Sequence, residues 1–213
     1  MASIIIHMAV TVNALDICGI ETDRDEYLVG TILPDYVTEE NAHYKDLMGE
    51  RKFFNLARFR KEHADKLTDP IYKGYYLHLV QDMIFRDFMY NTHGFSPAER
   101  KNVLKLYADY QRLNGYLARR YSIPIEILKN MDVVASERYS DFTLNKPELA
   151  EETEKYHNIN ICPEGEYSFF TPEMAEEYVR LASDACIREM LALRGEKEHI
   201  NEFDYSWIRF FNS

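Results

Sequence analysis

Cysteine, glycine and proline are scarce in this chain of 213 residues, which contains three, eight and seven of them. The cysteines, Cys18, Cys162 and Cys186, are odd in number, far apart and outside any C-x-x-C pair. This argues against a disulfide framework and favours a reducing compartment. No uncharged apolar run approaches the roughly 18 residues of a membrane-spanning helix. Residues 1–7 lack the basic start of a secretion signal, so we expect a cytoplasmic protein without a transmembrane segment.

Positive charge is also in deficit, because 25 Lys and Arg face 36 Asp and Glu, for a net charge of −11. Such a chain is repelled by phosphate backbones and anionic membrane surfaces unless a basic patch overrides the repulsion. The pair Arg119–Arg120 is too short to form one. We therefore expect no nucleic-acid partner, and a small molecule is the better substrate hypothesis.

Helical patterns dominate the chain, and 46% hydrophobic residues suffice for a full core. Asp69-Pro70 is a typical helix start, and Ser96 with Glu99 has the spacing of a capping box. The hydrophobic periodicity and these signals predict helices near 4–15, 25–33, 52–65, 70–91, 96–120, 125–131, 147–156 and 171–193. Only 159–170 has the pattern of a short β-hairpin. We expect an all-α multi-helix bundle that forms one domain over residues 1–213.

The predicted helix 70–91 carries polar residues where apolar ones belong. One face of this helix is formed by residues 71, 75, 78, 82, 85 and 89, and its centre holds His78 and Asp82. A buried carboxylate without a partner costs several kcal/mol, so something must compensate. Residues four apart lie on one helix face, and both side chains can reach a single cation. A buried His–Asp hydrogen bond without a metal is the alternative.

Three further residues could complete a metal site in the core. His7 interrupts an apolar run, Asp35 follows a Pro at the end of a predicted helix, and His43 lies eight residues later. Imidazole and carboxylate groups suit Zn²⁺, and also Fe or Mn. With His78 and Asp82 the set has five members, enough for two ions if one carboxylate bridges them.

The order and spacing of these residues resemble the zinc-dependent phospholipase C family, whose superfamily also includes fungal single-strand nucleases. The resemblance covers residues 7–82 and rests on His7, Gly30-x-x-x-Pro34-Asp35, His43 and Gly74-Tyr75-x-Leu77-His78-Leu79-x-x-Asp82. It implies an all-α fold with a metal cluster in the core. It also implies that Asp35, His43, His78 and Asp82 hold one metal, while His7 holds a second and Asp82 bridges.

The family's third metal site is not expected in this chain, because no H-x-x-x-E follows residue 82. His93 is interpreted as a histidine at a helix C-terminus, where it faces the helix dipole. We therefore expect one or two zinc ions.

The function predicted from the sequence is metal-dependent hydrolysis of a phosphoester, in which metal-activated water attacks phosphorus. Asp35 is the candidate general base. The substrate is either a phospholipid or a small phosphoester. The alternative is a non-catalytic helical interaction protein that retains a structural metal site.

Two other metal-binding classes have less support in the sequence. None of the seven histidines is followed by Asp, as an HD-type phosphohydrolase requires. A ferritin-like di-iron bundle needs two E-x-x-H pairs on facing apolar helices. Three such pairs occur outside apolar stripes: Glu40 and His43, Glu154 and His157, and Glu196 and His199.

Overall fold

The computed structural model describes the chain except residues 1, 130–141, 157–158, 160–164 and 209–213. Its α-helices are α1 (Ile4–Ile17), α2 (Arg24–Tyr36), α3 (Leu56–Glu62), α4 (Pro70–Arg86), α5 (Arg100–Arg120), α7 (Lys146–Tyr156) and α8 (Pro172–Leu193). A π-helical turn, Asp87–Thr92, continues α4, and a 3₁₀ turn, Glu202–Tyr205, precedes the last strand. The predicted all-α bundle is confirmed.

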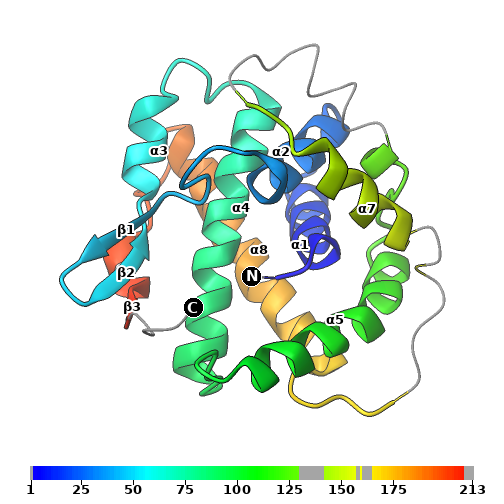
Figure 1. Ribbon diagram of the computed structural model, residues 1–213. Coiled ribbons are helices and arrows are strands. Elements are labelled where there is room, and N and C mark those ends of the chain that lie inside the picture. The colour runs from blue at the N-terminus through cyan, green and yellow to red at the C-terminus, as the bar shows by residue number, and fades with distance from the viewer. Residues whose placement is uncertain (1, 130–141, 157–158, 160–164, 209–213) are drawn as a thin grey trace.

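Helix α4 runs through the middle of the molecule, with the strands on one side and α5 and α7 on the other (Figure 1). It begins where the sequence predicts, because Asp69 accepts a hydrogen bond from the Ile71 N–H and Pro70 occupies the first turn. Helix α5 does not begin at the predicted capping box. It starts at Arg100, after Glu99, whose side chain makes no capping hydrogen bond.

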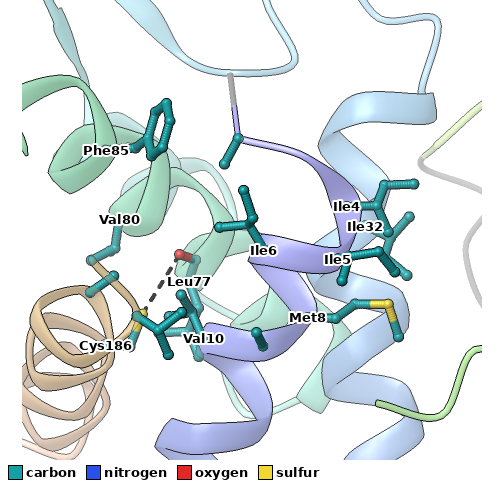
Figure 2. Close-up of a cluster of buried hydrophobic side chains, with 14 of the residues drawn as sticks. Ile4, Ile5, Ile6, Met8, Val10, Ile32, Leu77, Val80, Phe85 and Cys186 are labelled. Atoms are coloured by element: carbon teal, nitrogen blue, oxygen red, sulfur yellow. Dashed lines mark hydrogen bonds between the residues drawn. The ribbon is translucent and has the colours of Figure 1, made fainter. Parts of the chain in front are cut away.

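The apolar core lies where α1, α2, α4 and α8 meet. Figure 2 shows side chains of α1 packed between Ile32 of α2, Leu77 of α4 and Cys186 of α8. The Cys186 thiol donates to the Leu77 carbonyl at 3.9 Å and is fully buried. Because α1 is apolar on all sides, its His7 and Thr11 are buried with the rest. Among the described residues, no helix is both long and apolar enough to cross a membrane.

Two glycines of the motif allow α2 and α4 to pack backbone against backbone. A Cβ atom on Gly30 would lie 2.1 Å from the Ile71 carbonyl oxygen, and one on Gly74 would lie 2.2 Å from that of Tyr27. No side chain larger than hydrogen fits at this crossing. The crossing brings the last turn of α2, with Asp35, beside the middle of α4.

We expect Gly74→Ala to destabilise the fold by about 3 kcal/mol, the upper end of the range for overpacked cores. The added methyl group meets main-chain atoms of Tyr27 and Thr31, which cannot rotate away as a side chain can. Chemical denaturation measures the loss. Lys73→Ala, on the neighbouring half-buried position of α4, is the control, and an equal effect of both changes would contradict the close-crossing argument.

A three-stranded antiparallel sheet covers one side of the bundle. Strand β1 (Lys45–Met48) pairs with β2 (Arg51–Phe54), which pairs in turn with β3 (Trp207–Ile208). The hairpin therefore lies at 45–54. Of the segment 159–170, where the sequence pattern placed it, 160–164 fall outside the described residues and 165–170 form no strand.

The predicted helix 52–65 begins too early, because its first residues belong to β2. Asn55 ends the strand and caps α3, since its side chain accepts a hydrogen bond from the Arg58 N–H at 2.8 Å. The sheet matters for the site because β1 begins two residues after His43.

Candidate metal centre

The five predicted ligands come from four parts of the chain and meet in one place. His7 lies on α1, Asp35 on the last turn of α2, His43 in the loop before β1, and His78 and Asp82 on α4. The shortest distance, 3.1 Å, joins His43 Nε2 to Asp35 Oδ1. His78 Nε2 lies 4.0 Å from the same oxygen, and the His7 and His78 rings stack with centroids 4.0 Å apart.

Burial divides the cluster into an inner and an outer part. His7, His78 and Asp82 are fully buried, whereas the side chains of Asp35 and His43 are 13% and 14% exposed. The inner ligands are thus withdrawn from water, and the outer pair forms the side of the cluster that solvent reaches.

Four buried atoms of the inner part lack a hydrogen-bond partner among the described residues. They are Nε2 of His7, Nε2 of His78 and both carboxylate oxygens of Asp82. Leaving a buried polar group unpaired costs about 1–3 kcal/mol, and more when it is charged. All four atoms have lone pairs to share, and a metal cation is a partner that several lone pairs can share at once. The chemistry of the set therefore fits a metal ion.

The two oxygens of Asp82 face different imidazoles. Oδ1 lies 3.7 Å from His7 Nε2, and Oδ2 lies 3.9 Å from His43 Nε2. Ligand atoms lie within 4.8 Å of one another in two overlapping groups, His7–Asp35–His78 and His43–His78–Asp82. The two groups share His78, so each group offers three candidate ligands for an ion.

The protonation states are those that a metal ligand needs. Burial lowers the pKa of His78 to about 3, and the neighbouring His7 adds to this effect. Burial opposes ionisation of Asp35, but the His78 imidazole and the hydrogen bond from His43 lower its pKa to about 2. The pKa of Asp82 is also held well below its usual range, by His78 and Lys45 against the effect of burial. At neutral pH the site offers a neutral imidazole at His78 and two carboxylates.

Lys45 is a cation near the cluster that the sequence did not indicate. Burial lowers its pKa to about 8, while Asp82 and Asp35 act to raise it. It lies at the start of β1, two residues after His43, where the sequence pattern predicted no strand.

A cavity of about 760 Å³ opens beside Asp35. Its walls come from the start of α1, the end of α2, α5 and α7, and include Tyr36, Tyr107, Asn114, Glu152 and Tyr156. This volume lies in the range of small-molecule pockets. The outer edge of the cluster therefore faces a space that can admit a small organic molecule.

Three other histidines, His93, His157 and His199, are not part of the ligand cluster that the structure describes. His93 follows the π-helical turn and packs on Phe88 with ring centroids 4.3 Å apart, away from both ligand groups. His199 hydrogen-bonds to Glu189 rather than to a metal group. His157 falls outside the described residues.

No family model, curated protein or solved structure matches this chain.

Proposed function

We propose that the cluster of His7, Asp35, His43, His78 and Asp82 binds one or two zinc ions and that the protein hydrolyses phosphoesters. The observation that carries this proposal is the set of four fully buried lone-pair atoms without hydrogen-bond partners among the described residues. The resemblance of residues 7–82 to zinc-dependent phospholipases C supports the choice of reaction. Fe or Mn could occupy the same nitrogen and oxygen ligands.

A catalytic rather than a purely structural role is favoured by the outer side of the cluster. A structural zinc site is closed by protein ligands, whereas a catalytic site keeps a position open. Here Asp35 belongs both to the ligand cluster and to the wall of the 760 Å³ cavity. A substrate in that cavity lies beside the ligands without any rearrangement of the core.

Asp35, the inner ligands and Lys45 would have different roles in hydrolysis. A zinc ion held by these ligands would lower the pKa of a bound water and polarise phosphoryl oxygens. The Asp35 carboxylate is ionised and partly exposed, so it can orient a water molecule in the cavity and accept its proton as that water attacks phosphorus and the ester's alcohol oxygen leaves. Its pKa of about 2 makes it a weak base, so this step depends on a bound metal that would lower the pKa of the water. The buried inner ligands keep bulk water out, and Lys45 adds positive charge near Asp82 for a phosphoryl group.

The cavity favours a phosphoester with a compact organic group. Its wall offers tyrosine rings and side-chain amides, and Lys155, the one cation among its described lining residues, is paired with Glu151 and Glu152. A lipid headgroup or a small phosphoester fits this lining, and a polyanion is disfavoured by the neighbouring carboxylates.

Metal analysis combined with a screen of simple phosphomonoesters and phosphodiesters tests the proposal. We expect about one to two equivalents of zinc, iron or manganese per chain. His78→Ala should lose at least one equivalent and all hydrolytic activity, because His78 belongs to both ligand groups. His93→Gln is the matched control and should retain both.

Full metal content in His78→Ala would overturn the assignment of the site. A wild-type protein that binds metal tightly but hydrolyses no phosphoester would instead favour the structural alternative. These measurements therefore test metal binding and phosphoester hydrolysis separately.

A further inference from the structure

A chain of buried hydrogen bonds runs behind His7, on the side away from the ligand cluster. His7 Nδ1 lies 2.8 Å from Gln81 Oε1, and Gln81 Nε2 lies 2.9 Å from Thr11 Oγ1. Thr11 Oγ1 lies 3.0 Å from Thr31 Oγ1, which lies 2.9 Å from the Tyr27 carbonyl oxygen. The side chains of His7, Thr11, Thr31 and Gln81 are fully buried. Unlike Nε2 of His7 and Nε2 of His78, the polar side-chain atoms on this side all have hydrogen-bond partners.

The direction of every bond in this chain follows from its last member. The Tyr27 carbonyl can only accept, so the Thr31 hydroxyl donates to it. Thr31 has one hydroxyl hydrogen, so its oxygen must accept from Thr11, whose own oxygen must then accept from the Gln81 amide. This fixes the orientation of the Gln81 side chain and leaves its carbonyl oxygen facing His7. His7 therefore carries its hydrogen on Nδ1, and its Nε2 lone pair faces Asp82.

His78 is fixed by the same residue of α2. Its Nδ1 lies 2.7 Å from the backbone carbonyl oxygen of Thr31, which again can only accept. His43 differs, because its Nε2 lies 3.1 Å from a carboxylate oxygen of Asp35, an acceptor to which it donates. In the metal-free protein two imidazoles thus present lone pairs at Nε2, and the third, on the outer side, carries a hydrogen there that metal binding through this atom would displace.

We propose that Thr31, Thr11 and Gln81 are positioning residues that set His7 and His78 in the Nδ1–H tautomer before any ligand arrives. Metal-ligating histidines depend on such outer partners, whose loss typically weakens metal binding by about 10–100-fold. The consequence for zinc rests on the proposed function, whereas the tautomers are a property of the metal-free protein. Gln81 hydrogen-bonds to His7, and Thr11 lies one hydrogen bond further from the imidazole.

Nitrogen NMR of the histidine-labelled, metal-free full chain tests this proposal. Recorded well above the ordinary imidazole pKa of about 6.5, the spectrum should show His7 and His78 as Nδ1–H tautomers and His43 as Nε2–H. His7→Gln identifies the resonances of His7. An Nε2–H tautomer at His7 in the wild-type protein overturns the proposal.

Thr11→Val provides the sharper test, because it removes one hydroxyl group that makes no hydrogen bond to the imidazole. Without it the Gln81 amide can turn over, so we expect both tautomers of His7 and a zinc Kd weaker by about 10–100-fold. Thr11→Ser keeps the hydroxyl and should restore both readouts. Ser183→Ala removes another buried hydroxyl, which donates to the carbonyl of Val10 on α1, the helix of Thr11. It should change neither the His7 tautomer nor the zinc Kd.

An unchanged His7 tautomer in Thr11→Val contradicts the positioning role, whether or not zinc binds. The expected tautomers in a protein that binds no metal would support the hydrogen-bond chain and refute the metal site instead. If Thr11→Val does not fold, Gln81→Glu tests the acceptor at Nδ1 instead, and an Nε2–H tautomer of His7 in that variant contradicts the positioning role. A carboxylate still accepts from Nδ1–H, so His7 should stay in the Nδ1–H tautomer.

Discussion

Replacing Asp82 by asparagine should abolish the stabilisation that zinc gives the folded protein. At a free zinc concentration 1,000 times its Kd, a ligand that binds only the native state contributes about 4 kcal/mol. Asp82 supplies two oxygens without hydrogen-bond partners among the described residues, one toward His7 and one toward His43. Asparagine keeps the shape but offers one uncharged oxygen and directs N–H groups at lone pairs. Chemical denaturation with and without zinc measures the difference.

Asp109→Asn is the matched control for this change. Asp109 is also fully buried, but its carboxylate accepts hydrogen bonds from the backbone N–H groups of Ser168, Phe169 and Phe170. Its replacement should lower the free energy of unfolding and still leave the zinc-dependent increment intact. Persistence of that increment in Asp82→Asn would remove Asp82 from the ligand set.

The central helix was predictable because its signals are local. Asp69-Pro70 marks the start of α4, and the stripe that contains His78 and Asp82 is visible at helical spacing. Two ionisable residues at the centre of an apolar helix point to a compensating partner whatever the tertiary structure is. Gln81 is a third polar residue buried in this helix, and it indicates a second polar contact there.

The contacts between elements could not be predicted in the same way. The hairpin 45–54 is short, and its third strand, at 207–208, comes from the far end of the chain. The backbone crossing at Gly30 and Gly74 depends on how two helices meet. The hydrogen-bond chain joins three different helices, so no spacing in the sequence records it. Spacing and the family resemblance predicted five ligands, and the fold brings all five together, but their metal-binding role stays a prediction.

A second buried acid, Glu189 near the end of α8, should have the largest effect on stability outside the metal site. Its carboxylate is fully buried and accepts from the Tyr76 hydroxyl at 2.5 Å, from His199 Nδ1 at 2.7 Å and from the Ile200 N–H at 2.5 Å. Arg60 donates to the same tyrosine hydroxyl and lies 4.0 Å from the carboxylate. The Glu189 side chain therefore connects α8 to α3, to α4 and to the segment that leads to β3.

Glu189→Ala should lower the free energy of unfolding by about 3–5 kcal/mol, because it leaves three donors without their acceptor and a partly buried Arg60 without its counter-charge. Glu189→Gln keeps one acceptor oxygen and should cost less. Glu196→Ala removes an exposed acid from the same region and should stay within about 0.5 kcal/mol of wild type. Equal losses for Glu189→Ala and Glu196→Ala would contradict the role of the buried carboxylate.

The same variant separates the stability of the scaffold from the metal site. Glu189 contacts none of the five ligands, so the zinc-dependent increment should survive in Glu189→Ala wherever the protein still folds. Hydrogen exchange should accelerate first at Ile200 and Trp207, because the segment between them loses its attachment to α8, and within the described part of the chain β3 pairs with two residues of β2. Uniform acceleration through α4 would instead mean that Glu189 supports the whole bundle rather than the docking of this segment.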